Sequence, residues 1–202
     1  APTRPTPWSS ALRGIWAARA GGGVAHTGGG RPRAAVLPVL RHVKDQPAIG
    51  QGAGPIGMIM GPTRELVTQI GKDCKKFGRA AGLVAASVYG GSGVAAQIGE
   101  LKLGCEIVAC TPGRMIDVLT TGAGRITNLR RVTYMVLDAA GRMFDLGVEP
   151  QITRIMNHLR PDRQPVVFSA TFPRAPTPPS PADTSPRTSR SAGPAVSCWR
   201  GA

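Results

Sequence analysis

Three short segments combine residue types that can bind phosphate groups. They are Pro62-Thr63-Arg64, Gly90-Gly91 and Thr111-Pro112-Gly113-Arg114, and each follows an apolar run typical of a strand. Small residues allow a polyanion backbone to approach closely, helix starts offer backbone N–H groups, and arginines add positive charge. The alternative is that Thr63 and Thr111 are helix caps and that the arginines are solvated. The first interpretation predicts contacts that read a phosphate backbone and carry no sequence information.

A carboxylate also lies at the end of a predicted strand. Asp138 ends the apolar run 132–138, so it lies where a strand is predicted to stop. A carboxylate there is as well suited to anchoring a divalent cation as to capping the strand end. Both interpretations of Asp138 stay open at this point.

The charge of the chain points to phosphate-rich partners. Its 202 residues carry a formal charge of +14, of which residues 1–50 contribute +6, residues 51–172 +5 and residues 173–202 +3. A basic balance favours nucleic acid through the release of counterions, although arginine-rich ends can also reflect a GC-rich coding sequence. No apolar run approaches the ~20 residues of a membrane span, and no secretory signal is recognised. We therefore expect no membrane partner.

The cysteines do not predict a metal site. Cys74, Cys105, Cys110 and Cys198 form no CxxC pair and have no histidine at a spacing that suits zinc. The first three lie in apolar patterns and are predicted to be buried, reduced core residues, which implies a reducing compartment.

The segments that must position these residues alternate between short apolar runs and amphipathic stretches. The predicted strands are 56–60, 83–89, 106–110, 132–138 and 165–170; the predicted helices are a stretch around 66–77, Ala95–Leu101, a segment beginning at Pro112 and about 150–159, with 34–42 as a helix interrupted by Pro38. Apolar strands alternating with helices are typical of an α/β fold with a parallel sheet covered by helices on both faces. In such a three-layer fold, ligands bind at the carboxyl ends of the strands.

Five short sequence motifs occur along the chain in a fixed order. They are PTREL at 62–66, GG at 90–91, TPGR at 111–114, VLD at 136–138 and SAT at 169–171. Together they resemble motifs Ia, GG, Ib, II and III of the DEAD-box RNA helicases, over about residues 55–174. Intervening text such as RMFDLG and RPDRQPVVFSATFPRA is similar to the branch of that family that acts in pre-mRNA splicing. The resemblance implies the first RecA-like domain of an ATP-dependent RNA helicase.

More faintly, residues 25–46 resemble the family's phosphate loop and the helix after it, where AxTGxGKT is expected. The resemblance implies that ATP phosphates are bound by Thr27, Gly28, Gly30 and Arg31. Arg31 replaces the family's lysine and keeps the charge without the compact ammonium geometry. Pro32 replaces the threonine, so a Mg²⁺-binding hydroxyl and a backbone donor are both lost. The alternative is a glycine-rich loop with no nucleotide role.

The resemblance also assigns catalytic positions, with ATP and Mg²⁺ as the implied cofactors. These positions are Asp138, which would bind the metal, and Ser169 and Thr171. The DEAD string reads Asp138-Ala139-Ala140-Gly141 in this chain. Ala139 replaces the glutamate that activates the attacking water, and losing a general base typically costs ~10²–10⁴ in rate. Gly141 replaces the carboxylate expected to link motif II to motif III.

Partners follow from the same resemblance. RNA is implied to contact Pro62, Thr63, Arg64, Gly90, Gly91, Thr111, Pro112, Gly113 and Arg114. Splicing factors are implied as protein partners, and the nucleus as the location.

The predicted organisation is a single RecA-like domain over residues 25–174. Residues 1–24 are expected to be disordered or degenerate, although 5–11 resemble the family's adenine-reading segment without its glutamine, Ser9 or Ser10 being nearest. Residues 175–202 are rich in Pro, Ser and Thr and are expected to be a disordered tail. Because the family's second domain supplies arginines worth ~10³–10⁵ in rate, we expect this chain to be a feeble or inactive ATPase. The alternative function is a non-catalytic RNA- or protein-binding remnant.

Overall fold

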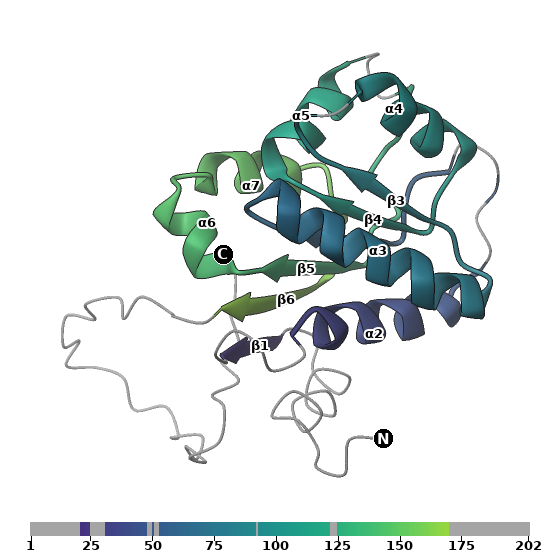
Figure 1. Cartoon of the computed structure of the whole chain (residues 1–202), viewed down its shortest axis with the longest axis horizontal. Helices are drawn as coiled ribbons and strands as arrows, with labels where there is room; N and C mark the ends of the chain where they lie inside the picture. The colour runs from purple at the N-terminus through teal and green to yellow at the C-terminus, as the bar shows by residue number, and fades with distance from the viewer. Residues whose placement is uncertain are drawn as a thin grey trace, which may run out of the picture.

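Helices and strands alternate along the chain (Figure 1). The computed structural model describes residues 21–24, 31–47, 50, 53–91, 93–121 and 125–169, with side chains from Ala35 onward. The elements are β1 (Gly21–Val24), α2 (Arg31–Lys44), β2 (Gly57–Met60), α3 (Arg64–Ala81), β3 (Ala85–Val88), α4 (Val94–Leu103), β4 (Ile107–Cys110), α5 (Pro112–Thr120), β5 (Tyr134–Asp138), α6 (Ala140–Asp145), α7 (Glu149–Met156) and β6 (Gln164–Ser169).

The strands form one sheet of six strands in the order β1-β6-β5-β2-β4-β3. Every pair of neighbours is parallel, as in Ile59 opposite Ala109 on one side and Val136 on the other. Parallel strands need crossover connections, and the helices between successive strands supply them. All six carboxyl ends therefore lie on the same edge of the sheet.

Two hydrophobic cores cover the two faces of this sheet, because successive side chains of a strand point to opposite faces. Ile59 packs into the first core, with buried residues of α2 and α3 such as Val39 and Ile70. Its neighbours Met58 and Met60 pack into the second core, which contains the buried sides of α4, α5, α6 and α7. The result is a three-layer α/β/α arrangement, so the predicted fold class is confirmed.

Some local predictions fail. The helix expected to be interrupted at Pro38 is continuous from Arg31 to Lys44. A proline inside a helix costs ~3 kcal/mol or more, but buried residues on both sides of it, Ala35, Val36, Val39, Leu40 and Val43, hold the helix on the sheet. Strand β1 and helix α6 were not predicted, since GGGV has little strand propensity and α6 spans only 6 residues.

Three cysteines lie in the two cores as predicted. Cys74, Cys105 and Cys110 are buried and not in disulfides. Burial raises the pKa of each thiol to about 12, so the thiols are protonated at neutral pH. Cys198 lies outside the described residues. Among those residues, no helix has the length and apolar character needed to cross a membrane.

Candidate functional site

The carboxyl edge of the sheet brings together residues that are far apart in the sequence. The residues after β2, β3 and β4 are the three predicted phosphate-binding segments, while Asp138 and Ser169 are the last residues of β5 and β6. Arg31 is the first residue of α2, and its side chain is not described. Thr27, Gly28, Gly30 and Thr171 lie outside the described residues, so the two loops that would complete the site stay predictions.

The segment after β2 forms a helix start. Thr63 is the N-cap of α3, with φ −125° and ψ 154°, and its hydroxyl accepts a hydrogen bond from Leu66 N at 3.4 Å. This bond satisfies one of the backbone donors at the helix start and leaves others directed along the edge. Gly61 N donates to Cys110 O over 3.0 Å, which fixes this turn beside the turn after β4. Thr63 is therefore a helix cap at the carboxyl edge of the sheet, the edge at which open α/β sheets generally bind ligands.

Arg64 and Gly91 are in direct contact. Nη1 of Arg64 donates to the carbonyl of Gly91 at 3.4 Å, joining the turns that follow β2 and β3. Gly91 has φ +77°, and a Cβ placed there would lie 2.8 Å from the same Nη1. The left-handed backbone favours glycine at this position, whereas the close approach involves only the end of the flexible Arg64 side chain. At Gly90 a Cβ would meet no atom within 4 Å, so this residue keeps an open surface.

The segment after β4 starts α5 with a different cap. Pro112 occupies the first turn, where its missing N–H is no loss. Thr111 makes no capping bond with its side chain, while its N–H donates to Val88 O at 2.9 Å. Arg114 has a side chain only 20% exposed, with Nη1 at 4.0 Å from Asp117 Oδ2. Thr111 is thus the N-cap of α5 by position but makes no side-chain capping bond, and the largely buried Arg114 does not match the alternative of a solvated arginine.

Asp138 and Ala139 mark the end of β5. Asp138 is completely buried. Ala139 has φ 60° and ψ 45°, and among the described residues it is the only non-glycine residue with a positive φ. A left-handed conformation costs an L-residue roughly 1–2 kcal/mol, and such strain tends to persist where the surrounding structure imposes it. The turn between β5 and α6 thus holds its shape although Ala139 carries no functional side chain.

Gly141 and Ser169 join the turn after β5 to the end of β6. Gly141 N donates to Ser169 Oγ at 3.0 Å in a buried environment. Gly141 lacks the carboxylate that the family resemblance implies as the link between motif II and motif III. The backbone N–H supplies a partner for Ser169 that the side-chain sequence alone did not predict.

Sequence reasoning missed one buried polar residue beside this edge. Gln97 of α4 accepts from Tyr89 N at 3.1 Å and donates to Tyr89 O at 3.0 Å. The side chain thereby fixes the backbone immediately before Gly90 and Gly91. The only signal in the sequence was a polar residue in an otherwise small and apolar helix, which does not identify a partner.

The arrangement is suited to binding phosphates more clearly than to binding metal. The starts of α3 and α5 lie on the edge that holds Arg64 and Arg114, and helix starts with cationic side chains bind phosphates. Among the described residues, no group of three or more His, Cys, Asp or Glu side chains is placed to hold a metal ion. Asp138 is the single predicted metal ligand that the structure describes.

Comparison with known proteins agrees with this architecture. The chain is 67% identical over 152 residues to DEAD-box ATP-dependent RNA helicase 42 of Oryza sativa subsp. japonica, which covers 75% of the chain and 14% of that protein. It is 57% identical over 173 residues to Probable ATP-dependent RNA helicase DDX46 of Homo sapiens, covering 85% of the chain and 17% of that protein. The chain thus spans less than a fifth of the length of these curated relatives.

A solved structure and a protein family also match this chain. The crystal structure of the yeast DEAD-box splicing factor Prp28 superposes with a TM-score of 0.67 at 33% identity, covering 75% of this chain and 37% of that one. This likeness confirms the predicted RecA-like fold. The DEAD/DEAH box helicase family matches residues 10–177. The chain therefore belongs to the DEAD/DEAH box helicase family.

Proposed function

We propose that this chain is the first RecA-like domain of an ATP-dependent RNA helicase, with an intact RNA-facing edge and impaired ATP turnover. The observation that carries the proposal is the Arg64–Gly91 contact, which joins two of the family's motifs at the carboxyl edge of the sheet. The sequence assigned the domain to residues 25–174, but β1 (Gly21–Val24) belongs to the same sheet, so the proposed domain is residues 21–174. Residues 1–20 and 175–202 are assigned no part in binding.

RNA binding at this edge is supported by two helix starts and two arginines. The first-turn N–H groups of α3 and α5 lie on the same edge as Arg64 and Arg114. Gly90 and Gly113 have space for a close backbone, since a Cβ on Gly113 would meet only Gln151 Oε1 at 3.5 Å. Such groups recognise the phosphate backbone and not the bases, so binding is indifferent to sequence and weakened by salt.

The residues at the proposed nucleotide site are better suited to binding Mg²⁺ than to hydrolysing ATP. Mg²⁺ commonly takes one or two carboxylates together with substrate phosphates and waters, and Asp138 would provide one carboxylate. The bound metal would neutralise phosphate charge in such a site. Ala139 has no carboxylate to activate water, and Arg31 and Pro32 alter the predicted phosphate loop. We propose that nucleotide binding is weak and turnover slow.

A splicing role and a nuclear location are part of the proposal. They are supported by the 33% identity to Prp28, a yeast DEAD-box splicing factor. Ala139 is the observation that favours the second candidate, a non-catalytic RNA- or protein-binding remnant, because an alanine cannot transfer a proton. ATPase activity in the presence of RNA separates the two candidates.

The test of RNA binding uses a fluorescent single-stranded oligoribonucleotide and the full chain. Replacing Arg64 and Arg114 by Ala is expected to weaken binding and to lower the salt slope by roughly 1.4, at ~0.7 per lost phosphate contact. The control replaces Arg130 and Arg131, which precede β5 at the opposite edge, and removes the same charge. Deleting residues 175–202 is expected to matter less than the first double substitution. If the control or the deletion weakens binding more, RNA does not bind at the proposed edge.

A further inference from the structure

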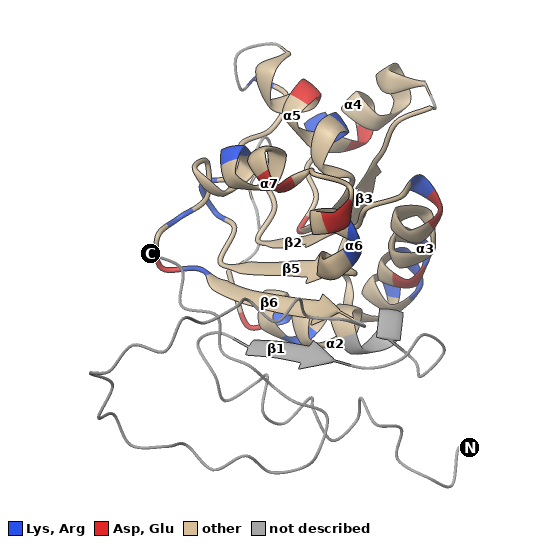
Figure 2. Cartoon of the chain, turned by 90° about the vertical axis from the view of Figure 1, so that its left-hand side faces the viewer, with Lys and Arg blue, Asp and Glu red and all other residues tan. Residues whose placement is uncertain are grey.

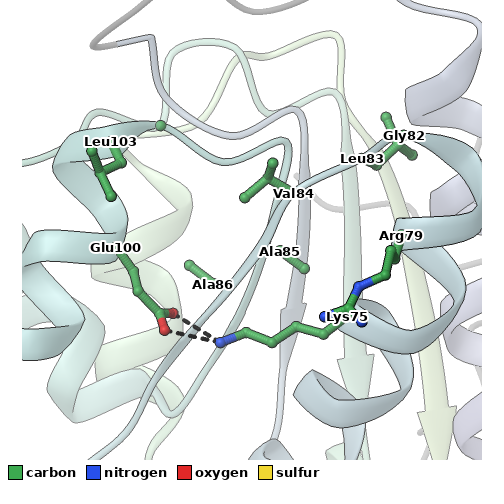
Figure 3. A pocket seen from close by; sticks show the side chains of 10 residues that line it. Lys75, Arg79, Gly82, Leu83, Val84, Ala85, Ala86, Glu100 and Leu103 are labelled. Atoms are coloured by element: carbon green, nitrogen blue, oxygen red, sulfur yellow. Dashed lines mark hydrogen bonds and ion pairs between the residues drawn. The ribbon is translucent and has the colours of Figure 1, made fainter.

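A groove runs along the free edge of the sheet, away from the site described above. Strand β3 is last in the strand order, so among the described residues it has a neighbouring strand, β4, on one side only. Two cavities of about 470 and 370 Å³ lie along it between α3 and α4. Both are lined by Lys75 and Glu100, so they adjoin and form one groove, the β3-edge groove. Figure 3 shows the larger of the two cavities.

The backbone of β3 presents hydrogen-bonding groups to this groove. Val84 O accepts from Glu106 N at 3.0 Å and Val88 O from Thr111 N at 2.9 Å, so these carbonyls face β4. In a parallel ladder the alternate residues face the other way, which places the N–H and C=O of Ala85, Ser87 and Tyr89 on the free side. Ala85 and Ser87 form no hydrogen bond on that side with any described residue.

Gln97 shows how the free edge accepts a partner. Its amide both accepts from Tyr89 N and donates to Tyr89 O, which is the pair of bonds that a neighbouring strand would make. A side chain therefore satisfies the edge at Tyr89, while Ala85 and Ser87 line the two cavities. An open edge of this kind is a template for strand addition.

A single ion pair crosses the groove. Lys75 Nζ of α3 lies 2.9 and 3.1 Å from the two carboxylate oxygens of Glu100 on α4, and the pair passes over β3 (Figure 3). The two side chains are 46% and 48% exposed. Because an exposed ion pair contributes only ~0–1 kcal/mol, an incoming carboxylate can replace Glu100 as the partner of Lys75 at little cost.

Charge and apolar surface identify the occupant. Lys72, Lys75 and Arg79 line the α3 wall of the groove against one acid, Glu100. Figure 2 shows that α3 as a whole carries both basic and acidic residues. At the end near the start of β3, Val84 is 56% exposed and Leu103 is 83% exposed. An occupant therefore needs carboxylates opposite α3 and an apolar side chain at this end.

Other occupants match less well. Residues 1–20 and residues 173–202 each carry a net charge of +3, so both would be repelled by the α3 wall. A second copy would bring the same lysines and arginine to the interface. We propose that the β3-edge groove binds an acidic, extended segment of a partner protein as an added strand beside β3, with an apolar side chain packed between Val84 and Leu103.

The probe is a fluorescent synthetic peptide of repeating Asp-Val-Glu-Ile, compared with the same peptide N-methylated at alternate amides and with single-stranded polyuridylate. Binding to the full chain is followed by anisotropy, and the amides of Ala85 and Ser87 by hydrogen exchange in NMR spectra. We expect the acidic peptide to slow exchange at both amides. N-methylation is expected to abolish this protection, because it removes the donors that pair with β3.

Variants test the charge requirement. Lys72→Glu with Arg79→Glu is expected to weaken peptide binding at least tenfold, while Glu100→Gln is expected to strengthen it by releasing Lys75. The control pair Lys44→Glu with Arg130→Glu makes the same change in net charge outside the groove, and circular dichroism reports whether each variant is folded.

Three results would overturn the proposal. In the first, the acidic peptide fails to protect Ala85 and Ser87 in the folded chain. In the second, the control pair weakens binding as much as the groove pair. In the third, polyuridylate protects the two amides and the peptide does not, which would make the groove a nucleic-acid surface.

Discussion

The backbone N–H of Gly141 lies 3.0 Å from Oγ of Ser169 and donates a buried hydrogen bond to it. Gly141 stands where the family resemblance leads one to expect a carboxylate, yet the turn after β5 is still tied to the end of β6. The geometry of this region is thus maintained by the backbone although the side chains have changed. It follows that a glycine at residue 141 is compatible with a fixed connection between the turn after β5 and the end of β6.

Replacing Ser169 by Ala is expected to destabilise the chain by about 1–3 kcal/mol, because the buried N–H of Gly141 loses its acceptor. The measurement is the free energy of unfolding in urea. Thr68→Ala is the matched control, since the hydroxyl of Thr68 donates to Arg64 O at the surface of α3. Equal losses of the free energy of unfolding in the two variants would show that the Gly141–Ser169 bond stabilises the chain no more than a surface hydrogen bond does.

Ala139→Gly is expected to raise the free energy of unfolding by up to about 1 kcal/mol, because glycine adopts a φ of 60° without the penalty that alanine has. Ala80→Gly, at an exposed position of α3, should instead lower it by roughly 0.5–1 kcal/mol. Urea unfolding of both variants gives the comparison. A loss of stability at residue 139 similar to that at residue 80 would mean that the left-handed turn is not strained.

His42 predicts a pH dependence. Burial lowers its pKa below the ordinary 6.5, an effect that the nearby Asp45 carboxylate opposes, and its Nε2 lies 2.8 Å from Thr133 Oγ1. The unfolded chain therefore takes up the proton first, so this contribution to stability is complete above pH 6.5 and is lost as the pH falls through the lower folded pKa.

The variant His42→Gln removes the titrating ring and keeps a group that can bond to Thr133. Its free energy of unfolding is expected to fall less than that of the original chain between about pH 7.5 and about pH 5.5. Unfolding in urea at the two pH values measures the difference. The assignment to His42 is wrong if both proteins lose the same amount.

Much of the fold was predictable because the strands are apolar runs closed by glycine and proline. IGMIM ends at Gly61-Pro62 and EIVAC ends before Thr111-Pro112, and both form strands where expected. β1 was not predicted, since its pairing with β6 depends on a tertiary partner that a local pattern of glycines does not reveal. The predicted interruption of the helix at Pro38 was wrong for a related reason. Packing of α2 on the sheet outweighs the unfavourable effect of a proline inside a helix.

The site was predictable where motifs place residues at strand ends, and less so where backbone atoms make the contacts. Asp138 ends a strand as predicted, and Ser169 ends the neighbouring strand, a pairing that the sequence did not reveal. The left-handed φ of Ala139 and the donor role of Gly141 N are properties of the backbone, which side-chain identities do not report. The bonds between Gln97 and Tyr89 link residues whose proximity depends on how α4 packs.

We propose that the RNA-facing edge is intact while the nucleotide site is impaired, and a calorimetric titration with Mg-ATP distinguishes this state from an intact nucleotide site. The original chain is compared with a variant carrying Arg31→Lys, Pro32→Thr, Ala139→Glu and Gly141→Asp, both shown to be folded by circular dichroism. We predict no saturable binding in the low micromolar range for the original chain and clear binding for the variant, with slow phosphate release from both. Saturable low-micromolar binding by the original chain, or no binding by the folded variant, would contradict this account.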